Sequence, residues 1–344
     1  MQTHKKTTHN YSITFDYLRV FAMLGVLAVH FAQAFPFSGD VSLIMWRGAC
    51  GVQIFFIISA YLACSFFLTK NASIATYYKK RALRILPTYY AAIVAVIAYV
   101  TFTTPGYKPD AYHLGWLRYF LGINMLIPAT DFSWNNAFGF WTMSMFIFFY
   151  AIIPFLIKYI HSTCRALFFF LACFFIAHAS HGLIQYLPDS CACPQYFIEC
   201  GPLYQMQFFA LGLLTFFATK ENKRSLVSIF IILLCMLPSQ ITPPHLLIAG
   251  LTSLFIMNIN EKDIMLHGTK LKLLQFTSKY SFHVYLTHGL ALAIAARLAT
   301  RFAETHTLAY HISKLSITII FILILCIFLE ISQRLANKIF TTKK

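Results

Sequence analysis

An arginine and a histidine stand eleven residues apart in the first long apolar stretch of the chain. Arg19 lies near the start of this stretch and His30 about two-thirds of the way along it. Eleven residues of α-helix advance by roughly 16 Å and end about 20° past three full turns, so both side chains would share one face. An imidazole can act as a general base near neutral pH, and a guanidinium can stabilise a developing negative charge. The spacing therefore predicts a cation at the entrance of a membrane site and a base deeper inside it.

A structural interpretation of the same pair stays open. Arg19 would then extend its charged group to the membrane interface, and His30 would form a hydrogen bond with a neighbouring helix. Against this, ionisable residues inside a membrane segment are costly and mark functional sites by default.

A second basic cluster follows the next apolar stretch and contains Lys79, Lys80, Arg81 and Arg84. Arg81 and Arg84 are three residues apart and would lie on one face of a helix. Guanidinium groups match phosphate oxygens well, so this pair predicts a site for an anionic ligand. The alternative is that the cluster only anchors the cytoplasmic end of a membrane span.

Few other polar residues lie inside the apolar stretches. Ser59 and His288 are in the middle of such stretches, and Glu330 is near the end of the last one. In membrane helices, groups of this kind more often form hydrogen bonds between helices than take part in catalysis, so we assign them supporting roles. No metal site is expected.

Composition indicates which elements must carry these residues. Of the 344 residues, 59% are hydrophobic and 11% are charged, whereas a soluble domain has about 25% charged residues. A helix that crosses the hydrocarbon core needs about 20 residues, so we expect an all-α, polytopic membrane protein with about ten spans. The apolar stretches are 17–35, 48–68, 85–102, 139–157, 166–182, 203–219, 225–240, 244–258, 281–298 and 312–333. Pro243 and Pro244 leave open whether the seventh and eighth form one interrupted segment.

Basic residues predict how these spans are oriented. The net charge of +16 would suggest nucleic acid in a soluble protein, but in a membrane protein it reports topology, and no nucleic-acid partner is expected. Of the 27 basic residues, 20 fall on one side of the ten-span arrangement, which becomes the cytoplasmic side with both termini. The domains expected are a cytoplasmic segment 1–16, a membrane domain 17–333 and a cytoplasmic tail 334–344. On the other side lie Arg47, Lys108, Arg118, Arg297, Arg301 and Lys314.

Three cysteines fall in a loop that this topology places outside the cell. Cys200 is expected to form a disulfide with either Cys191 or Cys193, because an oxidising compartment permits one. A zinc site is disfavoured there, since three thiols with no nearby histidine lack a fourth ligand.

Several segments, in chain order, resemble the signatures of acyltransferase family 3, a family of membrane proteins. Arg19 followed by His30 is similar to its Arg-x10-His signature. Further similar segments are Gly51 to Tyr61 (GVQIFFIISAY), Arg81 to Pro87 (RALRILP), Trp141 to Ser144 (WTMS) with Phe149, Tyr150 and Pro154, Ser281 to His288 (SFHVYLTH), and Glu330. The chain departs from the family pattern at Phe146, where a glutamate is usual, and at Ala60, where a glycine is usual.

The resemblance implies transfer of an acyl group, most often acetyl, from cytosolic acyl-coenzyme A to a hydroxyl of an extracytoplasmic glycan. The acceptor would be a surface polysaccharide, a lipopolysaccharide or a lipid-linked glycan at the bacterial cytoplasmic membrane. It implies His30 and Arg19 as catalytic residues and Arg81 and Arg84 as donor-binding residues. Trp141 and Tyr150 would join the supporting residues, and a separate extracytoplasmic protein is a candidate partner.

Two other functions compete with this one. A transporter of polar glycans would also bury a few polar groups, although no pair of Gly- or Pro-broken spans recurs in matching halves of the chain. A non-catalytic member of the same family is the third interpretation, and the missing glutamate at Phe146 keeps it open.

Overall fold

The computed structural model describes residues 13–37, 39–70, 73–105, 114–128, 138–259, 266–305 and 307–341. In this part of the chain every element is a helix, which confirms the expected all-α class. The helices are α1 (Ile13–Ala34), α2 (Gly39–Arg47), η1 (Gly48–Cys50), α3 (Gly51–Lys70), α4 (Ile74–Thr103), α5 (Leu117–Leu121), α7 (Phe140–Tyr159), α8 (Thr163–Ser180), η3 (His181–Tyr186), α9 (Pro194–Glu199), α10 (Pro202–Lys220), α11 (Arg224–Cys235), α12 (Pro244–Asn258), α13 (Gly268–Ala299) and α14 (Leu308–Thr341).

Seven helical segments among the described residues are long and apolar enough to cross a membrane, so the chain is a polytopic membrane protein. They contain α1, α3, α4, α7, α8, α13 and α14. The other three predicted stretches coincide with α10, α11 and α12. With 12 and 15 residues, α11 and α12 are only about 18 and 22 Å long, which is less than a hydrocarbon core of about 30 Å. A count of ten crossing helices stays a prediction.

Two helices, rather than one interrupted helix, form between residues 224 and 258. Pro244 is the first residue of α12 and Pro243 caps it. Proline fits this position because the first turn of a helix has no internal acceptor for its N–H groups. The Thr242 hydroxyl donates to the carbonyl of Leu234 at 2.8 Å, which ties the connection back to α11.

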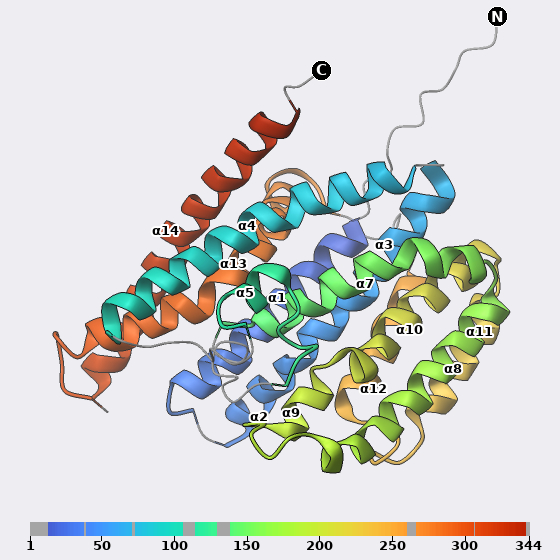
Figure 1. The fold of residues 1–344 in the computed structure, drawn as a ribbon, viewed down its shortest axis with the longest axis horizontal. Coiled ribbons are helices and arrows are strands. Elements are labelled where there is room, and N and C mark those ends of the chain that lie inside the picture. The colour runs from blue at the N-terminus through green and yellow to red at the C-terminus, as the bar shows by residue number, and fades with distance from the viewer. Residues whose placement is uncertain are drawn as a thin grey trace, which may run out of the picture.

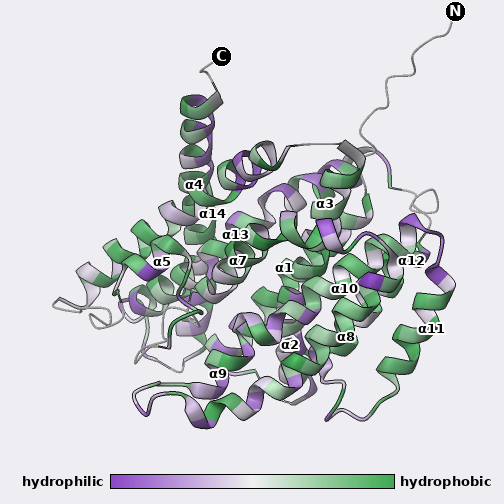
Figure 2. Cartoon of the chain, turned by 45° about the vertical axis from the view of Figure 1, so that its right-hand side comes forward, coloured by the Kyte–Doolittle hydropathy of each residue, from purple (hydrophilic) through white to green (hydrophobic). Residues whose placement is uncertain are grey.

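The long helices form two flanks around a central group (Figure 1). Helices α4, α13 and α14 lie side by side on one flank, α8, α10, α11 and α12 form the other, and α1, α3 and α7 run between them. Figure 2 shows hydrophobic residues along most of the length of these helices. In the central segment that contains α3, 56% of the residues in its most apolar 18-residue stretch are buried inside the protein. In α14 the corresponding share is 11%. A helix that is apolar all round and buried lies inside the bundle, whereas α14 faces outward.

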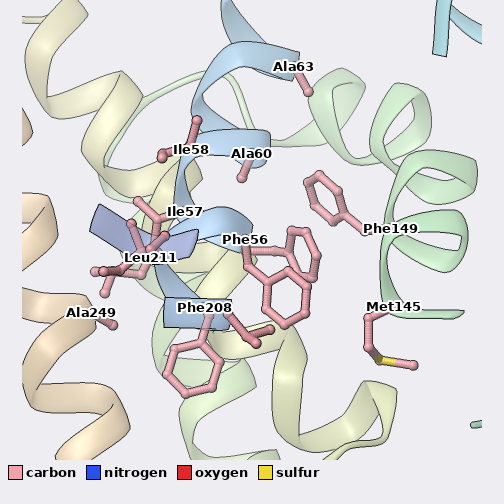
Figure 3. Packing of buried hydrophobic residues seen from close by; sticks show 14 of the residues in the cluster. Phe56, Ile57, Ile58, Ala60, Ala63, Met145, Phe149, Phe208, Leu211 and Ala249 are labelled. Carbon is pink, nitrogen blue, oxygen red and sulfur yellow. The ribbon is translucent and has the colours of Figure 1, made fainter. Parts of the chain in front are cut away.

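Aromatic residues fill the contact between α3, α7 and α10 (Figure 3). Phe209 stacks on Phe56 with ring centroids 4.5 Å apart and on Phe149 at 3.9 Å. Phe56 and Phe149 point toward each other in the close view, next to Phe208 and Leu211 of α10. These rings close the bundle behind the candidate site described below.

Glycines allow α3 to approach its neighbours with backbone in contact. A Cβ atom on Gly51 would lie 2.3 Å from the carbonyl oxygen of Ala22 in α1, and one on Gly212 would lie 2.6 Å from that of Ile57. No real side chain fits at such distances. Small residues at helix contacts are the usual way in which membrane helices pack closely.

A residue of α14 supplies the backbone hydrogen bond that α4 lacks at an internal proline. Pro87 has no N–H group, so the carbonyl of Leu83, four residues earlier, lacks its usual helical donor. The side-chain amide of Gln333 donates to this carbonyl, and its oxygen accepts from the hydroxyl of Thr88 at 3.0 Å. The segment that carries Arg81 and Arg84 is therefore fixed against the last helix.

Candidate active site

A cavity lies between α1, α3, α4, α7 and α13, and three arginines line it. Its polar lining comes from five helices and consists of Arg19, Ser59, Arg81, Arg84, Thr142, Tyr150, Ser281 and Tyr285. No aspartate or glutamate is among the residues described as lining it. The structure thus gathers five of the residues singled out from the sequence, namely Arg19, Ser59, Arg81, Arg84 and Tyr150, around one positively charged space.

Arg19 is held from behind by residues that the sequence reasoning did not single out as functional. Its Nη1 atom donates to Oδ1 of Asp16 at 3.0 Å, and the side chain of Asp16 is 4% exposed. The hydroxyl of Ser278 in α13 donates to the same Asp16 oxygen. Asp16 therefore orients the guanidinium and links α1 to α13, which leaves the remaining N–H groups of Arg19 available to a ligand.

The two arginines of α4 sit differently in the cavity. The Arg81 guanidinium carbon lies 5.0 Å from the ring centroid of Tyr150 and 5.5 Å from that of Tyr77. Such cation–π contacts hold a guanidinium in place without neutralising its charge. Arg84, one helical turn further along, shares the cavity wall with it. The predicted common face of these two residues is thus present in α4.

The rest of the cavity lining is apolar. Val52, Phe55, Ile58, Leu62, Phe146 and Phe282 line it. Phe146 stands where the family pattern has a glutamate, and its ring packs edge-on against Phe56 at 5.0 Å and stacks on Tyr150 at 5.9 Å. The position with the unusual residue is thus part of the cavity wall.

His30 does not line this cavity, although the sequence placed it on the same helix face as Arg19. It meets His288 of α13 instead, with ring centroids 4.7 Å apart. His288 is fully buried, and its Nδ1 atom lies 2.7 Å from the carbonyl oxygen of Tyr285. The Tyr285 hydroxyl points the other way, to Thr142 at 2.8 Å in the cavity wall. Tyr285 therefore stands between the arginine cavity and the pair of histidines.

Hydrogen bonds define which nitrogen of each imidazole carries the proton. Nδ1 of His30 lies 3.0 Å from Oε1 of Gln33. A backbone carbonyl can only accept, so Nδ1 is the protonated nitrogen in neutral His288. With the Gln33 amide oxygen facing it, His30 takes the same tautomer. Each ring then keeps a lone pair on Nε2, as a general base requires.

Like His288, two other supporting residues, Trp141 and Glu330, do not line the cavity. Trp141 packs edge-on against Phe56 at 6.2 Å, so its contact is one of core packing. Glu330 binds Arg334 at 2.9 Å and lies 3.6 Å from both Lys279 and His283 in a neighbouring groove.

The three loop cysteines flank the short helix α9. Cys193 precedes it and is exposed, whereas Cys200 follows it and is buried, as is Cys191. Cys193 and Cys200 cap the six-residue helix α9 and are seven positions apart. At about 1.5 Å per residue their Cα atoms are about 10 Å apart, beyond the reach of a disulfide, so α9 favours Cys191 as the partner of Cys200. Burial raises the pKa of the Cys200 thiol, which keeps it protonated. The disulfide itself stays a prediction.

A family comparison decides what kind of protein carries this site. The model described as an acyltransferase domain, that of acyltransferase family 3, matches residues 13–331. The chain belongs to acyltransferase family 3. The match begins with α1 and ends within α14, so it includes the arginine cavity and both histidines.

One curated relative is the peptidoglycan O-acetyltransferase OatA of Listeria monocytogenes. It is 32% identical over 109 residues, which cover 29% of this chain and 16% of the relative. No solved structure matches the chain.

Proposed function

We propose that this protein transfers an acyl group, most often acetyl, from cytosolic acyl-coenzyme A to a hydroxyl of an extracytoplasmic glycan. The observation that carries the proposal is a cavity lined by three guanidinium groups, with no carboxylate among its described lining residues. Such a site favours a ligand with several negative charges, and the diphosphate of coenzyme A is one. The basic end of α4 would then be the cytoplasmic end, where the donor is made.

His30 acts as the general base in this proposal. Its Nε2 atom takes the proton of the acceptor hydroxyl, whose oxygen attacks the thioester carbonyl. The carbon–sulfur bond breaks, and the leaving thiolate receives the proton from the imidazolium, so the base is regenerated. His288 supports His30, and Arg19 orients the donor or stabilises the negative charge that develops at the carbonyl.

The separation of the histidines from the cavity adds one requirement. The phosphates would bind among the arginines, and the long thioester arm would pass Tyr285 to reach His30. Tyr285 lines the cavity, and its ring centroid lies 5.8 Å from that of His288, so it is the residue beside which this arm would pass.

The acceptor class rests on the family and on the named relative. Peptidoglycan is the acceptor in the name of the Listeria protein. For this chain we propose a glycan or lipid-linked glycan outside the bacterial cytoplasmic membrane, with or without a separate extracytoplasmic partner protein.

Transfer is tested with purified protein in lipid vesicles, radiolabelled acetyl-coenzyme A and an extracted envelope glycan. The wild type is expected to label the glycan, and His30→Ala to lower the rate at least about 100-fold, because a general base contributes that much. His161→Ala, which changes an exposed histidine between α7 and α8, is the matched control and keeps the wild-type rate. Labelling by His30→Ala at the wild-type rate would refute the role of His30. Movement of unlabelled glycan across the vesicle membrane would favour a transporter instead.

A further inference from the structure

A second groove, beside the arginine cavity, is lined by residues of α4, α13 and α14. These three helices lie side by side in Figure 1. The two spaces share Arg84, Ser281 and Phe282 as a common wall. Most residues that line the groove are polar or charged, in contrast to the apolar outer surfaces of the same helices. Gln333 ties α14 to α4 through the Leu83 carbonyl, and Ser278 ties α13 to α1 through Asp16. The charged side chains of the groove take no part in these contacts and need another explanation.

The charges around the groove favour an anion. Lys80, Arg84 and Lys279 line it, against the single carboxylate of Glu330. Glu330 is shared, since Arg334 also binds it at 2.9 Å. The Lys80 ammonium lies 5.2 Å above the ring of Phe66, a contact that leaves its charge uncompensated.

A buried histidine provides a second and independent sign of a ligand. His283 is only 7% exposed, and neither of its ring nitrogens has a hydrogen-bond partner among the described residues. Its Nε2 atom is 3.6 Å from Glu330, which is too far for a hydrogen bond. Buried polar groups are nearly always satisfied, so an unsatisfied imidazole in a groove indicates a missing partner.

We infer that this groove binds a phosphate monoester, namely the 3′-phosphate on the ribose of the acyl-coenzyme A donor. The inference rests on the proposed function. One nucleotide carries both the diphosphate and the 3′-phosphate, and Arg84 borders both spaces, so a single ligand can occupy them together. Lys80 and Lys279 hold the phosphate oxygens, and His283 donates or accepts a hydrogen bond beside them. The arginine cavity takes the diphosphate.

The test is equilibrium dialysis of radiolabelled coenzyme A and of 3′-dephospho-coenzyme A with the purified full-length protein. Wild-type protein is expected to bind coenzyme A about tenfold more tightly, because hydrogen bonds between charged groups contribute that much. The double variant Lys80→Gln/Lys279→Gln is expected to lose this preference. It binds both compounds equally, with the affinity that the wild type has for 3′-dephospho-coenzyme A. Lys270→Gln/Lys272→Gln removes the same charge from exposed positions outside the groove and keeps the preference. Lys80→Arg/Lys279→Arg restores it.

The outcomes separate the possible failures. Wild-type protein that binds neither compound contradicts the proposed function itself. Equal binding of both compounds by the wild type contradicts only the inference, as does an equal loss for both compounds in the groove variant. The phosphodiester of an anionic lipid is also a negatively charged phosphate, so the measurement is repeated in phosphatidylcholine vesicles with and without phosphatidylglycerol. Competition by phosphatidylglycerol, without any preference for the 3′-phosphate, would assign the groove to lipid and overturn the inference.

Discussion

Both candidate catalytic residues on α1 are positioned by a partner from their own helix. Asp16 lies three residues before Arg19, and Gln33 lies three residues after His30. Residues at this spacing are neighbours on a helix surface, so the two partners could have been found from the sequence once the helix was assigned. The contact between His30 and His288 could not, because it depends on how α1 and α13 pack.

The wall of the cavity also shows where residue-level prediction stops. Arg81 and Arg84 were expected on one face from their spacing, and both line the cavity. His30 shares α1 with Arg19 but lies beyond the wall formed by Tyr285, which is a residue of α13. Helical spacing orders residues along one helix, whereas a barrier from a second helix is visible only in the packed structure.

Phe146 is expected to limit the length of the acyl group. Its ring lines the cavity, so Phe146→Ala opens space beside the apolar wall. We expect the ratio of kcat/KM for butyryl- over acetyl-coenzyme A to rise about tenfold. One additional methylene group in an apolar pocket changes kcat/KM by about 10-fold or more. The measurement is steady-state transfer with both donors.

Phe149 is the matched control for this substitution. It belongs to the same helix and stacks on Phe209 at 3.9 Å, but it does not line the cavity. Phe149→Ala should lower thermal stability and leave the donor ratio unchanged. An equal shift of the donor ratio in both variants would show that it comes from a general loss of packing, and would contradict a specific role of Phe146 in limiting acyl length.

At the scale of helices, the apolar stretches predicted the positions of the elements but not their lengths. The stretch 85–102 corresponds to α4, which begins at Ile74, and the stretch 281–298 to α13, which begins at Gly268. The added turns are polar, as in Lys79 to Arg84, and hydropathy does not detect helix outside the hydrocarbon core. Those turns carry Arg81, Arg84 and Lys279, so these three basic residues of the proposed donor site lie in the part of the helices that the pattern misses.

Close contact between α1 and α3 gives a prediction for stability. Gly51→Ala places a methyl group against the backbone of Ala22, and the helices must separate. We expect this to cost about 1–3 kcal/mol, which lowers the melting temperature of the protein in detergent. Gly182→Ala is the control, because a Cβ atom there meets nothing within 4 Å. Equal melting temperatures for the two variants would refute the contact.

For the molecule as a whole, two exposed native cysteines can report the predicted orientation. Cys164 lies in the first turn of α8 on the side assigned to the cytoplasm, and Cys193 lies in the loop assigned to the outside. In right-side-out membrane vesicles with reductant, a membrane-impermeant maleimide should label Cys164→Ser but not Cys193→Ser. Inverted vesicles should give the opposite result. The reverse pattern in both preparations would invert the topology and remove the donor site from the cytoplasmic face.

The bond from Gln333 to the carbonyl of Leu83 has a consequence for how the protein is made. The two residues are 250 positions apart in the chain. The Leu83 carbonyl, which lacks its helical donor because of Pro87, therefore gains a partner only after the last helix has been made. A nascent chain that ends before residue 333 holds all three arginines and both histidines, yet its arginine segment still has an unpaired carbonyl. The arginine segment, and with it the proposed donor site, is therefore completed only when synthesis and insertion of the final helix are complete.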